Sequence, residues 1–218
     1  MNRPVLAAIV GGSGSGKSWL ADKLANALGR DAARLSLDDF YRDRSHLSMA
    51  RRDRLNFDHP RAIDWPVLEK ALRQILRGRA TRIPCYDFGT HCRLARFKML
   101  RPKRIVLMDG LWLLQRKSIR TLFDLSIFLD CSARIRLARR LPRDLRVRGR
   151  SDSSVRRQFR QTVQPMHVRH VAPQVRFADV VLKGQCTVQQ VQKFATTLRT
   201  HGKSRIFSST PKPHVRWG

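Results

Sequence analysis

The sequence lacks the hydrophobic runs and the cysteine patterns of several protein classes. No stretch approaches the roughly 18 consecutive apolar residues that a membrane-spanning helix requires. The N-terminal residues lead into an apolar strand pattern without the segments of a secretory signal, so we expect a cytoplasmic protein with no membrane partner. The four cysteines, Cys85, Cys92, Cys131 and Cys186, form no C-x-x-C pair. Free thiols are therefore expected rather than a disulfide framework or a metal cluster.

Acidic and aromatic residues are also scarce. The chain has 45 Lys and Arg against 16 Asp and Glu, a formal net charge of +29, and 7% aromatic residues. Thirteen arginines but only two acids lie between residues 131 and 176. Such a charge attracts nucleotides or nucleic acid. A basic surface that is solvated and binds no partner is an equally supported interpretation. Phe159 is the only Phe, Trp or Tyr in this segment, and Phe177 follows the segment directly; so few aromatic residues disfavour a surface that stacks nucleic-acid bases.

The clearest positive signal is the string GGSGSGKS near the N-terminus. It matches G-x-x-x-x-G-K-[ST], the phosphate-binding P-loop, and it consists of Gly11, Gly12, Ser13, Gly14, Ser15, Gly16, Lys17 and Ser18. An apolar strand pattern precedes it and a helical pattern follows it, as this loop requires. Small residues let the backbone N–H groups face one anion. We expect Lys17 to reach the β- and γ-phosphates of a nucleotide and Ser18 to bind Mg²⁺.

The rest of the chain alternates between strand and helix patterns. Apolar runs predict strands at 34–37, 104–108, 125–129 and 178–182, and Asp64 is expected to cap a helix that ends near Gly78. Helices are expected from about Ala133 and about Ser153, the second bent or interrupted at Pro165, and at 188–198. This order predicts a three-layer α/β fold with a parallel sheet. We expect one domain over residues 1–200, with a small β flap at about 81–100, and a basic, disordered tail at 201–218.

Three positions supply the chemistry that phosphoryl transfer needs. Asp109 ends a predicted strand and is placed to hold Mg²⁺ opposite Ser18. Asp38 follows another strand and either accepts a proton from a substrate hydroxyl or caps the next helix. The segment at about 140–152 is rich in arginine and contains Pro142 and Gly149. It forms either a mobile basic lid between two helices or a solvated helix face.

Taken together, these segments resemble the uridine/cytidine kinase family of P-loop kinases. The resemblance rests on GGSGSGKS at 11–18, SLDDFYRD at 36–43, NFDHPRAIDW at 56–65, IPCYDFGTHCR at 83–93, MDGLW at 108–112, LFDLSIFLD at 122–130, RLARRLPRDLRVRGR at 136–150 and QPMHVRHVAPQVRFADVVL at 164–182. It implies transfer of the γ-phosphate of ATP or GTP to the 5′-hydroxyl of uridine or cytidine, with Mg²⁺ as cofactor. It also suggests a homo-oligomer.

The resemblance assigns further roles residue by residue. Asp38 matches the catalytic base, and Asp58 matches the carboxylate that binds the ribose hydroxyls. Tyr86 and His91 match the pair that reads the edge of a pyrimidine. The remaining matches are Tyr41 near the nucleoside, Phe88 as an apolar wall, Arg140, Arg150 and Gln158 as nucleoside and phosphate contacts, and Arg143 and Arg148 as lid residues.

The sequence departs from the family pattern at four places. Asp109 stands where Glu is frequent, Ser151 replaces an acid, and Phe159 stands where Tyr is common. The string LKGQ at 182–185 replaces a proline-containing loop near the nucleotide base, so the choice between ATP and GTP stays open. Two other interpretations also stay open: a related kinase for a sugar phosphate or nicotinamide riboside, and a basic nucleic-acid-binding NTPase.

Overall fold

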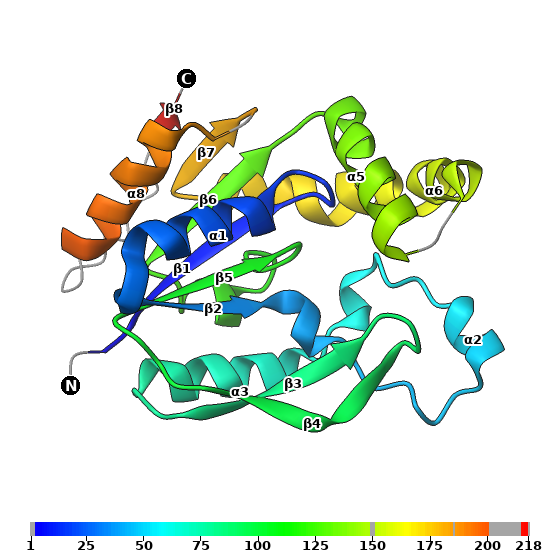
Figure 1. Cartoon of the computed structure of the whole chain (residues 1–218), viewed down its shortest axis with the longest axis horizontal. Helices are drawn as coiled ribbons and strands as arrows, with labels where there is room; N and C mark the ends of the chain where they lie inside the picture. Colours follow the sequence, from blue (N-terminus) through cyan, green and yellow to red (C-terminus); the bar gives the residue numbers. More distant parts are fainter. Residues whose placement is uncertain (1–2, 149–150, 185, 201–214, 218) are drawn as a thin grey trace.

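The computed structural model describes residues 3–148, 151–184, 186–200 and 215–217 (Figure 1). Its centre is a six-stranded sheet in the order β2-β5-β1-β6-β7-β8, in which every paired strand is parallel. The strands are β1 (Val5–Gly11), β2 (Ala32–Ser36), β5 (Ile105–Gly110), β6 (Leu125–Asp130), β7 (Val180–Lys183) and β8 (Val215–Trp217). The chain order changes direction at β1, so the P-loop leaves the sheet at the point where open parallel sheets bind ligands.

Helices cover both faces of this sheet. On one face, Ala7 and Ile9 pack with α1 (Lys17–Leu28) and α8 (Val188–Thr200), which lie side by side. On the other face, Ala8 and Val10 belong to the cluster of α3 (Trp65–Leu76). Residues that are buried on both faces explain why the strands read as continuous apolar runs. The predicted three-layer α/β fold is confirmed.

A separate two-stranded hairpin forms the predicted β excursion. It consists of β3 (Thr81–Asp87) and β4 (Cys92–Leu100), which pair antiparallel. The hairpin lies beside α3 and ends near α2 (Met49–Asp53) in Figure 1. Asp64 caps α3 as predicted, because its side chain accepts a hydrogen bond from the Val67 N–H at 3.4 Å.

Several element boundaries differ from the sequence-based prediction. Strand β2 ends at Ser36, so Asp38 lies in a 3₁₀ turn, η2 (Leu37–Phe40). Helix α5 (Ala133–Arg148) continues through Pro142, so Arg140 and Arg143 lie on a helix and not between two helices. The remaining short elements are η1 (Gly29–Asp31), η3 (Pro60–Ala62) and α4 (Lys117–Arg120).

The segment after α5 stays helical through Pro165, where we predicted a bend or interruption. It contains α6 (Asp152–Gln158), the π-helical η4 (Phe159–Val163), α7 (Gln164–Met166), the π-helical η5 (His167–Val171) and the 3₁₀ helix η6 (Ala172–Phe177). Proline has no N–H to donate and its ring crowds the preceding turn. The wider π turns on both sides of Pro165 accommodate these two constraints without ending the helix.

Three residues within the predicted tail form a strand. Val215–Trp217 form β8, which pairs parallel with β7, while 201–214 and 218 lie outside the described residues. Among the residues that the structure describes, no helix is long and apolar enough to cross a membrane.

Candidate active site

The P-loop joins β1 to α1 and has the backbone that its glycines predict. Gly14 and Gly16 have φ values of +80° and +98°, which disfavour side chains. The Lys17 ammonium donates a hydrogen bond to the Gly12 carbonyl at 3.1 Å. Burial lowers the pKa of Lys17, and the nearby carboxylates of Asp109 and Asp38 oppose that shift. A cation confined at this position is suited to neutralise phosphate charge.

Ser18 and Asp109 meet at the carboxyl end of the sheet. The Ser18 hydroxyl donates to Asp109 Oδ2 at 2.8 Å, and Asp109 is buried with 4% exposure. A hydroxyl and a carboxylate oxygen at one point are the hard ligands that Mg²⁺ prefers, and nucleotide phosphates and water usually complete its shell. The residues present therefore fit a magnesium ion.

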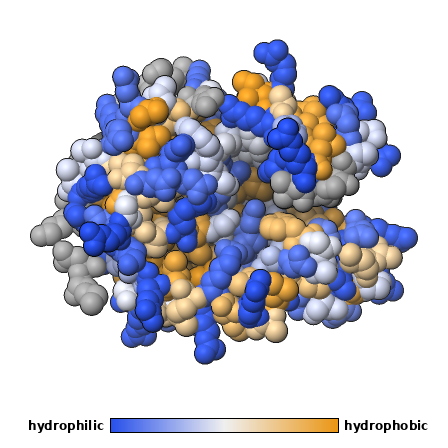
Figure 2. All heavy atoms as spheres, viewed as in Figure 1, coloured by the Kyte–Doolittle hydropathy of each residue, from blue (hydrophilic) through white to orange (hydrophobic). Residues whose placement is uncertain are grey.

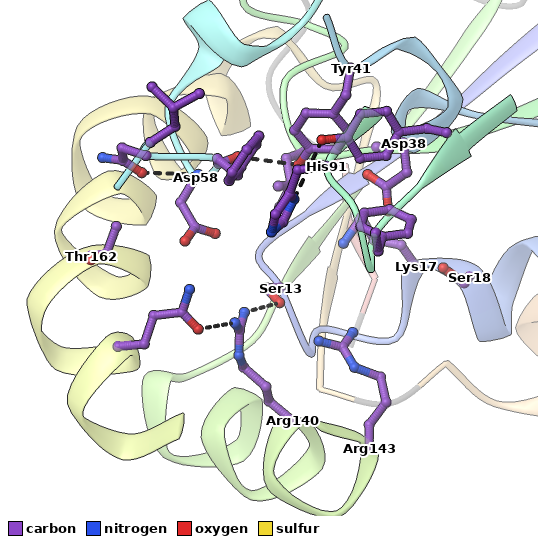
Figure 3. Close-up of a pocket in the computed structure, with 18 of the residues that line it drawn as sticks. Ser13, Lys17, Ser18, Asp38, Tyr41, Asp58, His91, Arg140, Arg143 and Thr162 are labelled. Carbon is purple, nitrogen blue, oxygen red and sulfur yellow. Dashed lines mark hydrogen bonds between the residues drawn. The ribbon is translucent and has the colours of Figure 1, made fainter. Parts of the chain in front are cut away.

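Asp38 faces the same space from η2. Ser36 caps this turn, because its hydroxyl accepts a hydrogen bond from the Asp38 N–H at 3.2 Å. The N-cap of this turn is therefore Ser36 and not Asp38. Figure 3 shows Asp38 between Tyr41 and Lys17, close to the P-loop.

Aromatic rings also line the site. Tyr41 and Tyr86 lie with their centroids 5.0 Å apart, and Phe88 packs edge-on against Tyr86 at 5.2 Å. His91 stacks on Phe57 at 4.1 Å with an interplanar angle of 11°. The Tyr86 hydroxyl lies 3.5 Å from His91 Nδ1, and burial raises the pKa of Tyr86, which keeps the phenol protonated.

The backbone of His91 has φ of +56° at the turn of the β3–β4 hairpin. A side chain in the left-handed region is uncommon, and such positions concentrate at functional sites. This conformation turns the ring toward Phe57 and the cavity (Figure 3).

Arg140 connects the P-loop to the helical segment opposite. It donates to Ser13 Oγ at 2.8 Å and to Gln158 Oε1 at 2.9 Å, and it pairs with Asp144 at 2.9 Å. Arg140 is only 4% exposed, so this network fixes its orientation. Figure 3 shows Arg140 and Arg143 extending from α5 toward the P-loop. Arg143 also pairs with Asp144 at 2.9 Å.

The structure brings most of the predicted residues to one cavity. The cavity has a volume of about 530 Å³, and Figure 2 shows the molecule hollowed here, between the part with α5 and α6 and the part with α2. Its lining includes Ser13, Lys17, Ser18, Asp38, Tyr41, Asp58, Tyr86, Phe88, His91, Asp109, Arg140, Arg143 and Gln158. Arg150 lies outside the described residues, and only the backbone of Arg148 is described, at the end of α5.

A second cavity lies on the other side of the P-loop. It has a volume of about 190 Å³, and its lining is more apolar. The residues around it are Ser15, Gly16, Trp19, Leu20, Leu129, Arg139, Gly184 and Cys186. The segment at 182–185, where the sequence departs from the family pattern, therefore borders this cavity as far as it is described.

Two residues behind the P-loop escaped the sequence analysis. Arg136 is only 1% exposed, and a Cβ on Gly12 would lie 2.8 Å from its Nη1 and 2.7 Å from His167 Nδ1. Burial, with the charges of Arg136 and Lys17, lowers the pKa of His167 to about 4. In the sequence, His167 is simply a histidine within a helical pattern. Such a pattern does not reveal that the side chain lies next to Gly12, which is distant along the chain.

The depressed pKa of His167 predicts a pH dependence of stability. The unfolded chain binds the extra proton as the pH falls below the ordinary value of about 6.5, whereas the folded protein resists protonation down to about 4. The free energy of unfolding therefore falls by up to about 3 kcal/mol as the pH decreases over this range. Urea unfolding at about pH 7.5 and about pH 5 should show a smaller loss in His167→Gln. The exposed His46 serves as control, and an equal reduction in His46→Gln would contradict the assignment.

A parallel sheet with this loop after β1, a half-buried lysine and an acid at the end of the adjacent strand are the features of a P-loop nucleotide-binding protein. The sequence model of the Phosphoribulokinase / Uridine kinase family matches residues 6–191, and the chain belongs to this family. The predicted family and the predicted class, an ATP-dependent kinase, are confirmed.

Named relatives agree with this assignment. The uridine kinase of Clostridium perfringens (strain ATCC 13124) is 39% identical over 183 residues, 84% of this chain and 88% of that protein. The uridine kinase of Brevibacillus brevis is 38% identical and covers 84% and 86% of the two chains. The structure of phosphoribulokinase from Rhodobacter spheroides shares the fold, with a TM-score of 0.63, 18% identity and coverage of 88% and 74%.

Proposed function

We propose that the protein transfers the γ-phosphate of ATP or GTP to the 5′-hydroxyl of uridine or cytidine. One observation carries the proposal: Lys17, Asp38 and the Tyr86–His91 pair line a single cavity. A nucleoside in this cavity places its sugar near Asp38 and its base among the aromatic rings. The uridine kinase relatives support the same substrate class.

In this proposal, each part of phosphoryl transfer has a residue. The P-loop and Lys17 bind the donor phosphates, and Arg143 adds positive charge from α5. Asp38 accepts the proton of the 5′-hydroxyl while that oxygen forms its bond to the γ-phosphorus and the nucleoside diphosphate leaves. Ser18 and Asp109 would hold Mg²⁺, which neutralises phosphate charge when bound.

The acceptor is recognised at both of its halves. Asp58 accepts hydrogen bonds from the ribose diol, since an ionised carboxylate is an acceptor only. Tyr86 and His91 bind the edge of the pyrimidine, and Phe88 and Tyr41 form apolar walls. Arg140 and Gln158, which hydrogen-bond each other at 2.9 Å, contact the nucleoside and the phosphate. The second cavity, beyond Gly16, receives the base of the donor nucleotide.

An ADP-release assay with Mg-ATP tests this function. The acceptors to compare are uridine, cytidine, adenosine, nicotinamide riboside and ribulose 5-phosphate, with DNA and RNA as controls. Turnover with uridine or cytidine alone is expected. Activity only with the sugar phosphate, with nicotinamide riboside or with nucleic acid would overturn the acceptor while leaving the kinase class intact. The uridine kinase relatives do not favour those alternatives.

The homo-oligomer, the cytoplasmic location and non-specific nucleic-acid contact stay predictions.

His91→Ala should weaken the selection of pyrimidines. Removing a hydrogen-bonding group from a partly buried site costs about 1–3 kcal/mol, or about 10- to 100-fold in kcat/KM for uridine. The affinity for MgATP should stay the same, because the P-loop, Lys17 and Ser18, and not His91, are proposed to bind the donor phosphates. The measurement is kcat/KM for uridine and adenosine, with His46→Ala as the matched control on the exposed surface. An unchanged preference for uridine would remove His91 from base recognition.

A further inference from the structure

Arg34 is a charged residue to which the proposed reaction assigns no role. It lies on β2, two residues before the end of the strand. Its guanidinium donates to Asp109 Oδ1 at 3.2 Å and also hydrogen-bonds the carboxylate of Asp22 on α1. Arg34 thus joins two elements that flank the P-loop.

The contacts of Asp109 are divided between two partners. Arg34 binds its Oδ1, and Ser18 donates to its Oδ2 at 2.8 Å. The Asp109 side chain is 5% exposed, whereas that of Asp22 is 59% exposed. Arg34 therefore connects a buried acid at the nucleotide site to an acid at the surface.

The fold fixes the position of the guanidinium. Ser36 is the register partner of Asp109 in the β2–β5 pairing, so Arg34 lies two residues away on the same face of the sheet. Ser18 and Asp22 are one turn apart on α1 and share a helix face. The planar fork of an arginine can bind both carboxylates at once, whereas a lysine offers one point charge.

We propose that Arg34 is a positioning residue for Asp109. It holds Oδ1 and thereby keeps Oδ2 directed at Ser18, where Mg²⁺ is proposed to bind. The inference rests on that proposed metal site. Partners that orient a metal-binding carboxylate typically contribute about 10- to 100-fold to metal affinity or activity.

Charge and orientation predict opposite changes in Mg²⁺ binding when Arg34 is removed, so the direction of the change tests the proposal. A guanidinium beside Asp109 repels a divalent cation, so charge alone predicts that removing Arg34 strengthens Mg²⁺ binding. Orientation predicts that removing it weakens Mg²⁺ binding.

The test is a calorimetric titration of the full chain with ADP, with and without Mg²⁺. The measured quantity is the gain in ADP affinity that Mg²⁺ produces. Arg34→Met should reduce this gain about 10-fold and leave the metal-free affinity unchanged. Asp22→Asn retains the charge of Arg34 but removes its second anchor, so it should reduce the gain in the same direction by less.

Arg73→Met is the control for the loss of an arginine from an ion pair, because Arg73 pairs with Glu69 on α3 at 2.6 Å and does not line the cavity. The control should keep the full gain. A gain that is retained or increased in Arg34→Met would overturn the proposal, and Asp22→Asn decides the question if Arg34→Met does not fold. A wild-type protein without any gain would instead overturn the metal site itself.

Discussion

Asp38→Asn is expected to lower kcat about 10²- to 10⁴-fold and to leave MgATP affinity unchanged. Asparagine keeps the size of the side chain but cannot accept the proton of the 5′-hydroxyl. The donor phosphates are bound by the P-loop and Lys17, which the substitution does not touch. Single-turnover kinetics and calorimetric titration with MgATP measure the two quantities separately.

Asp39→Asn is the control for this experiment. Asp39 is the next residue in η2, and its carboxylate pairs with Lys98 of β4 at 3.0 Å. An ion pair between these groups contributes about 0–1 kcal/mol, so little change in turnover is expected. If Asp38→Asn turned over at a normal rate, Asp38 would not be the base, and substrate positioning would have to account for catalysis.

The sequence predicted the elements whose signals are local. The P-loop follows a strand and precedes a helix, and the sequence patterns of both elements lie within about twelve residues of the loop. The parallel sheet followed from buried apolar runs separated by amphipathic helices. The ends of elements were harder to predict: a bend or interruption was expected at Pro165, and a lid between two helices was one expectation around Pro142, whereas both helical segments continue past these prolines. Tertiary packing on neighbouring turns overrides the local preference of a proline.

The site was predictable where a family string fixes a residue, and not where a contact joins distant segments. Phe57 stacks on His91, 34 positions further along the chain. Arg34 reaches Asp109 across 75 positions. Neither pair leaves a periodic or compositional signal, because each depends on the register of strands and on the direction of a hairpin. Arg136 was counted only as part of the basic surplus, although it is almost fully buried.

Gly14→Ala is expected to lower MgATP affinity at least about 100-fold. A Cβ at this position would lie 2.3 Å from the backbone oxygen of Arg136, and φ is +80°. Helix α5 cannot move aside easily, because Arg136 Nε donates to the Cys131 carbonyl at 3.1 Å and its side chain also binds Gln164. The loop must shift instead, and its N–H groups lose their alignment with the phosphates. Calorimetric titration with MgATP measures the loss.

Gly78→Ala separates the clash from the backbone strain. Gly78 has φ of +71°, and a Cβ added there would meet no atom of the described residues within 4 Å. It follows α3, outside the residues that line the cavity. The variant should lose about 1–2 kcal/mol of folding free energy and keep its MgATP affinity.

Wild-type MgATP affinity in Gly14→Ala would mean that α5 moves aside to accommodate the new side chain. The rigid contact between Arg136 and the P-loop would then have no part in phosphate binding, and the buried arginine would serve the packing of α5 alone.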